Sequence, residues 1–157
     1  NDSLVHTTFN WSLESSIFAV SRRSGGSSYA RLIHAGVNND VIAFFGAIDN
    51  NFATFFGTGQ TSWNDTAANT PNVSVANNCI MSIVKGNGVG LAVPYVNSTA
   101  QNPKNGTTAV TTGITLGAFA SQQYWTGPLG ELIIINGLAS STTRDSIINY
   151  LKTGWNL

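Results

Sequence analysis

Hydrophobic and polar positions alternate along most of this chain, and turns rich in Gly, Asn, Ser and Thr separate the alternating segments. A period of two residues is typical of β-strands with one buried face. Strands with such short, regular spacing predict an all-β fold, an antiparallel sandwich of two sheets. The predicted strands are Leu4–Trp11, Ser16–Arg22, Tyr29–Ala35, Val41–Ile48, Phe52–Phe56, Val73–Val84, Val89–Asn97 and Leu129–Ile135.

One short helix is expected near the C-terminus, after an apolar run from Leu132 to Ile135 that predicts a strand buried on both faces. Ser140 is a good N-cap for this helix, because its hydroxyl can accept a free backbone N–H. Gly154 can end the helix in the left-handed conformation. We expect Trp155 and Leu157 to follow that end and to fold back as a plug at the end of the sandwich.

This closing segment also carries a resemblance. The pattern G-x-L-G-E-L-I-I-I-N-G-L-A-S, then a helix and Y-L-K-T-G-W-N-L, resembles the end of the concanavalin A-like, laminin-G-like jelly-roll superfamily. Glu131 stands at the acidic position of that pattern and Trp155 at its tryptophan, although Gly precedes the tryptophan and Asn156 follows it. The resemblance implies an antiparallel two-sheet jelly roll with one short C-terminal helix. Lectins, glucanases, adhesion modules and virus structural proteins share that fold, so the fold leaves the function open.

The resemblance is strongest over residues 113–157 and weaker over Ser16–Arg22 and Val93–Asn97. Domains of this group usually carry further strands ahead of the one at Ser16–Arg22, whereas about fifteen residues precede it here. We therefore expect residues 1–157 to form one domain that lacks one or more strands, either alone or as the C-terminal part of a longer chain. Another chain would then cover the open edge, since uncovered edges invite pairing.

Charge is scarce in the composition. Charged residues make up 9% of the 157 residues, against about 25% in typical soluble domains, and the formal net charge is zero. A domain near zero net charge is poorly protected against association, which favours a place in an assembly or on a rigid virion or extracellular surface. Seven basic residues balance seven acidic ones, so we expect no nucleic-acid partner. No apolar run approaches the roughly 20 residues of a spanning helix, so we expect no membrane insertion.

The sequence offers little for catalysis. Glu14 and Glu131 are the only glutamates, and neither has an acid two or four residues away, so no carboxylate pair for glycoside hydrolysis is visible. His6 and His34, the latter expected to be half-buried in its strand, accompany no nucleophile elbow. Cys79 alternates with apolar residues and is expected to be an inert core thiol. We expect no enzyme activity and no cofactor, and we keep a glucanase-like enzyme acting through Glu131 as a remote option.

Calcium is the metal considered, because it is common in lectins of this shape. Calcium takes six to eight oxygen ligands, usually with several carboxylates. The clusters Asn38-Asn39-Asp40 and Asp49-Asn50-Asn51 supply one carboxylate each, and turn formation explains both equally well. We therefore predict no metal site.

Aromatic residues in polar loops are the remaining candidates for binding, since Trp and Tyr combine a large apolar body with a polar tip. Trp63, with Asn64 and Asp65 beside it in the longest polar loop, is the first candidate for a carbohydrate site. Tyr124 and Trp125 are the second candidate. Trp125 is favoured instead to pack over the mouth of the sandwich, and Trp63 fits a structural role equally well.

Two functions remain. The first is a non-catalytic structural or adhesion domain of a virion surface: a bacteriophage tail fibre, a tail-associated protein or a capsid decoration protein. Its partners would be other virion proteins or copies of itself. The alternative is a lectin-like, carbohydrate-binding module of a secreted or cell-surface protein, with a cell-surface glycan as its partner.

Overall fold

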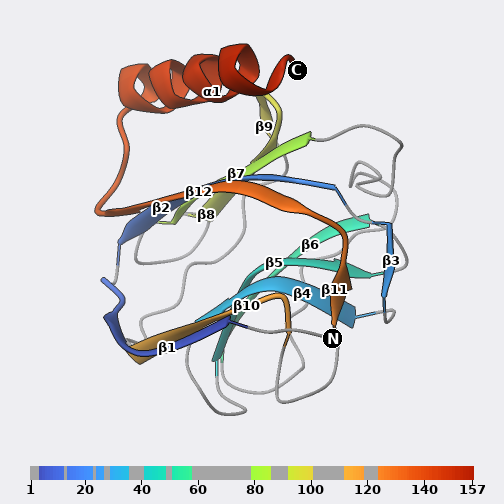
Figure 1. Cartoon of the computed structure of the whole chain (residues 1–157). Helices are drawn as coiled ribbons and strands as arrows, with labels where there is room; N and C mark the ends of the chain where they lie inside the picture. The colour runs from blue at the N-terminus through green and yellow to red at the C-terminus, as the bar shows by residue number, and fades with distance from the viewer. Residues whose placement is uncertain are drawn as a thin grey trace.

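A computed structural model of the chain describes residues 4–12, 14–22, 24–26, 29–35, 41–48, 51–57, 79–85, 92–100, 112–118 and 124–157. They form three layers: two five-stranded antiparallel sheets packed face to face, and one helix over the second sheet (Figure 1). This arrangement confirms the predicted all-β sandwich with one C-terminal helix.

The first sheet has the strand order β1-β10-β4-β5-β6 and the second has the order β12-β2-β7-β8-β9. Strands of the first sheet are β1 (Leu4–Asn10), β10 (Thr112–Leu116), β4 (Tyr29–Ala35), β5 (Val41–Ile48) and β6 (Asn51–Gly57). Strands of the second are β12 (Leu129–Asn136), β2 (Ser15–Ser21), β7 (Cys79–Lys85), β8 (Ala92–Val96) and β9 (Thr99–Ala100). The consecutive strands β5 and β6 pair antiparallel, and so do β7 and β8.

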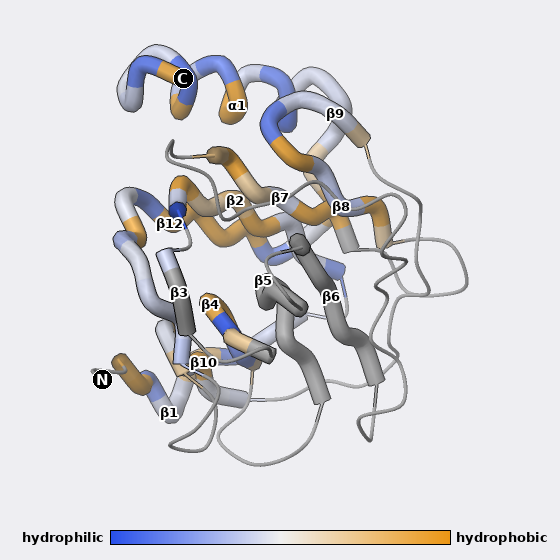
Figure 2. Tube along the Cα trace, turned by 90° about the vertical axis from the view of Figure 1, so that its right-hand side faces the viewer, coloured by the Kyte–Doolittle hydropathy of each residue, from blue (hydrophilic) through white to orange (hydrophobic). Residues whose placement is uncertain are grey.

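Two apolar clusters hold the layers together, one on each face of the second sheet (Figure 2). The cluster between the sheets is built from alternate residues of the inner strands, among them Ile17, Ala19, Met81 and Ile83. Trp11 closes it on the side of the first sheet, where its indole N–H donates to the carbonyl of Gly113 at 2.7 Å. The other cluster lies between the second sheet and the helix and consists of Phe18, Val20, Ile80, Ile148 and Leu151, all buried.

Strand β12 contributes to both clusters, as its unbroken apolar run predicts. Leu132 and Ile134 pack between the sheets, and Ile133 and Ile135 pack beneath the helix. These side chains are half-buried rather than buried, because β12 is the edge strand of its sheet and has a described neighbour on one side only, β2.

Two short strands were not among those predicted. Gly25–Gly26 form β3 and Trp125–Thr126 form β11, and the two pair antiparallel across about a hundred residues of sequence. Neither segment has a strand pattern of its own, so the pairing comes from tertiary contacts rather than from local propensity. His34 also differs from its prediction, since it is fully buried in β4.

The C-terminal helix α1 (Ser141–Trp155) begins as predicted and ends differently. The Ser140 hydroxyl accepts the backbone N–H of Thr143 at 3.1 Å, so the N-cap is confirmed. Gly154, however, is helical, and Asn156 is the residue that adopts the left-handed conformation, with φ 53°. Trp155 is therefore the last helical residue. It lies beneath the helix against β12, on the outer face of the second sheet, and does not plug the end of the sandwich.

Candidate functional site

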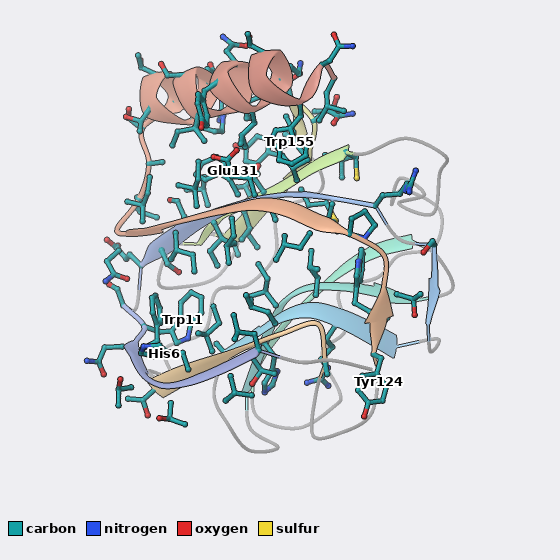
Figure 3. The ribbon with its side chains drawn as sticks, in the orientation of Figure 1. His6, Trp11, Tyr124, Glu131 and Trp155 are labelled. Carbon is teal, nitrogen blue, oxygen red and sulfur yellow. The ribbon has the colours of Figure 1, made fainter. Side chains whose placement is uncertain are left out.

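Three side chains lie close together at the protein surface, where the C-terminal end of α1 passes over β12. Glu131 projects from β12, and Tyr150 and Trp155 project from the helix. The Trp155 indole N–H donates to Oε2 of Glu131 at 3.0 Å, and Figure 3 shows the two residues side by side between helix and strand. A hydrogen bond to the same carboxylate raises the pKa of the Tyr150 hydroxyl. We call Glu131, Tyr150 and Trp155 the aromatic surface.

The absence of a side chain at Gly130 fixes how Trp155 lies. A methyl group at position 130 would lie 2.6, 2.8 and 2.9 Å from the adjacent ring atoms Cη2, Cζ2 and Cζ3 of Trp155. Because these distances are nearly equal, the strand backbone faces the flat side of the six-membered ring rather than its edge. One face of the indole therefore rests on β12.

Both aromatic side chains of this surface are strongly exposed. Tyr150 is 60% exposed, and Trp155 is 36% exposed although one of its faces is covered. Exposed large apolar groups cost free energy in water, and clusters of them mark binding sites in soluble proteins. An ionised carboxylate has about four lone-pair positions, so Glu131 keeps acceptor capacity after accepting the indole N–H of Trp155.

The elements that carry this surface are held firmly at several points. Lys152 donates to the hydroxyl of Ser98 at 3.0 Å, which ties the C-terminal half of the helix to the turn between β8 and β9. Arg144 donates to the Tyr95 hydroxyl at 2.8 Å and lies over its ring, which ties the N-terminal half to β8. The aromatic side chains therefore stand on a braced helix, and this reduces the entropy lost when a ligand binds.

The predicted carbohydrate residues fall elsewhere. Trp63, Asn64 and Asp65 lie outside the described residues. Trp125 is 8% exposed and belongs to the core between the sheets, as its predicted structural role requires. Its neighbour Tyr124 is half-buried at the opposite end of the fold from α1 (Figure 3). The structure thus places Tyr124 and Trp125 together, far from Glu131 and Trp155.

An open pocket of about 440 Å³ lies beside Trp125, where β11 crosses the mouth of the sandwich. Its walls carry one aromatic ring, four leucines and two glycines: Trp125, Leu4, Leu32, Leu116, Leu129, Gly117 and Gly127. The indole nitrogen of Trp125 is buried, with no hydrogen-bond partner among the described residues. The wall therefore presents apolar atoms and few polar groups, which makes this pocket a poor match for a ligand rich in hydroxyl groups.

Sequence reasoning missed the aromatic surface as a site. Glu131 was considered for the resemblance and for glycoside hydrolysis, and Trp155 was assigned to packing. Tyr150 carries the one local signal, because it is an aromatic residue away from the apolar stripe of Ile147, Ile148 and Leu151. An aromatic side chain on the solvent side of a helix has no packing role to explain it.

Other chemistry is sparse in the described part of the chain. No group of three or more His, Cys, Asp or Glu side chains that could hold a metal ion occurs there. The predicted clusters at 38–40 and 49–50 fall outside that part, and Asn51 opens β6. Within the same ranges, no helix has the length and apolarity needed to cross a membrane. Arg31 and His34 form a buried pair in β4 with Nη1 and Nδ1 3.1 Å apart, and burial lowers the pKa of Arg31 to about 10.

Solved structures with the same fold are numerous, although no protein-family model matches the sequence and no curated protein matches it. Domain 4 of AbnA, an extracellular arabinanase from Geobacillus stearothermophilus solved with arabinotriose, has a TM-score of 0.68 at 14% identity; the match covers 88% of this chain and 68% of that domain. The binding domain of botulinum neurotoxin DC, solved with SialylT, has a TM-score of 0.61 at 15% identity, covering 88% of this chain and 35% of the toxin chain.

Two further neighbours are parts of larger proteins. Trypanosoma rangeli sialidase with the inhibitor DANA has a TM-score of 0.63 at 10% identity, and the match covers 86% of this chain and 22% of the sialidase. The full extracellular region of zebrafish Gpr126 has a TM-score of 0.67 at 11% identity, covering 92% of this chain and 20% of that region. At these identities the likeness concerns the fold, a lectin-like β-sandwich of the kind that the resemblance implied.

Proposed function

We propose that this domain is a non-catalytic carbohydrate-binding module of an extracellular protein, and that the aromatic surface is its binding site. The observation that carries the proposal is the arrangement of Trp155 and Tyr150, two exposed aromatic side chains that a braced helix holds beside one carboxylate of strand β12, that of Glu131. A sugar ring presents apolar C–H faces and a rim of hydroxyls. It can stack on the indole while its hydroxyls donate to Glu131.

The way Trp155 is seated supports this reading over simple packing. A tryptophan that served only the core would be buried, as Trp11 and Trp125 are. Trp155 instead covers one face against Gly130 and stays 36% exposed. Aromatic side chains of this kind provide a large contact area at low cost in conformational entropy, because they have only two rotatable χ angles.

Similar folds support the same class of ligand. The arabinanase domain and the botulinum binding domain were both solved with saccharides bound. The virion-surface function finds no support among these neighbours and stays a prediction from composition. The extracellular setting is the better supported of the two, since the arabinanase and the Gpr126 region are described as extracellular.

A glycan array of the purified domain tests the proposal. We expect specific binding to a small set of glycans, and we expect Trp155→Ala to weaken it at least about tenfold, because truncating a central aromatic contact typically costs more than 1–2 kcal/mol. Gly130→Ala is the sharper variant. It keeps every proposed binding side chain but occupies the place where the ring rests, so it should also weaken binding.

Tyr124→Ala is the matched control, since it removes another partly exposed aromatic side chain at the other end of the domain. We expect it to leave binding unchanged while circular dichroism confirms that each variant is folded. An array without any bound glycan would refute the proposed function. If Tyr124→Ala abolished binding and Trp155→Ala left it unchanged, the binding site would lie at the mouth of the sandwich instead.

A further inference from the structure

We infer that the aromatic surface selects its saccharide by charge, so that it prefers a sugar with a protonated amine, tolerates a neutral sugar and rejects an acidic one. This inference rests on the proposed function, because it concerns the ligand of the same site. The argument combines the carboxylate of Glu131, the ring of Trp155 and the distribution of charge over the neighbouring helix.

Glu131 is the charged group at the centre of this surface, and its two described partners are neutral. The indole N–H of Trp155 donates to the carboxylate at 3.0 Å, and the same carboxylate raises the pKa of the Tyr150 hydroxyl. Neither of these neutral groups cancels its charge. A carboxylate held in this way keeps its negative field and its remaining lone pairs directed at a ligand. A cationic group that arrives beside it gains an ion pair, whereas an anionic group meets repulsion.

The described cations of the helix are engaged elsewhere. Lys152 reaches Ser98, in the turn between β8 and β9, whereas Glu131 lies on β12 at the opposite edge of the same sheet. Arg144 lies near the start of the helix, where it pairs with Asp145 at 2.8 Å and bonds to Tyr95. Neither side chain is bonded to Glu131 or neutralises it.

The helix flank that continues from Tyr150 is itself uncharged. Residues three and four apart share one side of a helix, so this flank carries Thr143, Ile147 and Gly154 together with Tyr150. A carboxylated sugar on this flank would find hydroxyl and apolar groups and one repelling carboxylate, and none of the flank's own residues is basic.

The aromatic rings add a second reason for the preference. A cation over the face of Trp or Tyr is attracted by the ring quadrupole, and Trp gives the strongest attraction of the three aromatic side chains. The ring of Trp155 is partly exposed beside Glu131, and the ring of Tyr150, which neighbours the same carboxylate, is 60% exposed. An ammonium group can therefore contact a ring and a carboxylate at once, which is a recurring way to bind ammonium ligands.

The test compares three soluble trisaccharides by isothermal titration calorimetry at low salt: a glucosamine trimer, its fully N-acetylated form and a galacturonic acid trimer. We expect the amine to bind about three- to thirtyfold more tightly than the N-acetylated form, the range that an exposed cation–π contact plus a surface ion pair provides. The acidic trimer should bind more weakly than both. Added sodium chloride should reduce the preference for the amine by screening.

Glu131→Gln is the decisive variant, because it removes the charge and keeps a side chain of the same size with an acceptor oxygen. We expect it to bring the affinities for the amine and the N-acetylated form within about twofold of each other, while binding of the neutral form persists. Asp145→Asn, which removes a negative charge at the far end of the helix, should leave the preference intact.

The outcomes separate the inference from the function on which it rests. Equal affinity of the wild-type protein for the amine and its N-acetylated form, or tighter binding of the acidic trimer, overturns charge selection while a positive glycan array upholds the carbohydrate-binding function. An amine preference that survives Glu131→Gln also overturns the inference. A blank array together with no binding of any trimer refutes both.

Discussion

Two buried serines on the same face of the second sheet differ in their hydrogen bonding. The Ser16 hydroxyl donates to the carbonyl of Gly137 at 2.9 Å and accepts the N–H of Ala139 at 2.8 Å, so it fastens β2 to the connection that leads into the helix. The Ser82 hydroxyl is equally buried, and within the described chain it has no partner. A buried hydroxyl contributes stability only when its hydrogen bonds are made.

Ser16→Ala should therefore lower the free energy of unfolding by about 1–3 kcal/mol, because it also leaves a backbone carbonyl and a backbone N–H without a partner. Ser82→Ala should change it by no more than about 1 kcal/mol and in the stabilising direction. Urea unfolding of the two variants and the wild type measures both. A loss at Ser82 equal to that at Ser16 would contradict the assignment.

Cys79 is a second residue whose behaviour follows from burial. Its thiol is 6% exposed and lies 3.5 Å from the carbonyl of Ser21, and burial raises its pKa from 9.0 to about 11. Since the thiolate is the reactive form, we expect the folded protein to resist alkylation by iodoacetamide at pH 8 and the urea-unfolded protein to react fully. Intact mass measures the extent. Rapid alkylation of the folded protein would contradict the buried position.

The same pKa shift predicts a pH dependence of stability. The folded state holds the Cys79 proton more tightly than the unfolded state, so this contribution is complete below pH 9 and declines as the pH rises from about 9 to about 11. The variant Cys79→Ala lacks this decline. Urea unfolding of the two proteins across that range should show the wild type losing more stability than the variant, while other alkaline titrations cancel in the comparison.

At the scale of elements, the end of helix α1 can be tested at Gly154, whose conformation differs between the sequence-based prediction and the structure. If Gly154 ended the helix in the left-handed conformation, as the sequence predicts, Gly154→Ala would destabilise the protein. In the structure Gly154 is helical and has open space around it, so the alanine should instead raise the free energy of unfolding by about 0.5–1 kcal/mol.

Gly137→Ala is the control for this prediction. Gly137 also has open space around it, but its φ of +135° lies in a region that residues with a side chain rarely adopt. We expect the alanine there to lower the melting temperature while Gly154→Ala raises it. Two shifts of the same sign would show that the conformation of one of these glycines is misassigned.

Local pattern predicted the elements well wherever one strand or helix carries its own signal. Strands β4 and β5 have the predicted bounds Tyr29–Ala35 and Val41–Ile48, and the helix begins at its predicted cap. The short strands β3 and β11 could not be foreseen. Each has two residues, and what makes them strands is a partner about a hundred residues away. Glycine and asparagine both tolerate the left-handed conformation that ends a helix. The sequence therefore offered Gly154 and Asn156 as C-caps, and the structure uses Asn156.

At the scale of the whole molecule, the candidate site arises from contacts between layers and not from any one segment. Glu131 lies on a strand and Tyr150 and Trp155 lie on a helix, and only the docking of the helix on the second sheet brings them together (Figure 3). Sequence reasoning searched loops for aromatic residues, which led it to Trp63 and Tyr124. A site shared between two regular elements requires the packing of those elements to be known first.

The helix thus has a structural role on which the proposed site depends, and this gives the last prediction. Leu151 is fully buried beneath the helix in a cluster with Phe18, Val20 and Ile80. Leu151→Ala should cost about 2–5 kcal/mol, as at a core position. Asn149→Ala, on the exposed side of the same helix, should cost less than about 0.5 kcal/mol. Urea unfolding measures both, and dye binding reports any exposed apolar face.

The position of the helix decides how these two losses are interpreted. If α1 only decorated the sandwich, Leu151→Ala would unfold the helix locally and leave the melting of both sheets unchanged. If α1 is the third layer, the loss spreads to the second sheet, because Phe18 and Ile80 are covered only while the helix is docked. Saccharide binding should then fall together with stability in Leu151→Ala, at temperatures where the variant is partly undocked, and should remain at the wild-type level in Asn149→Ala.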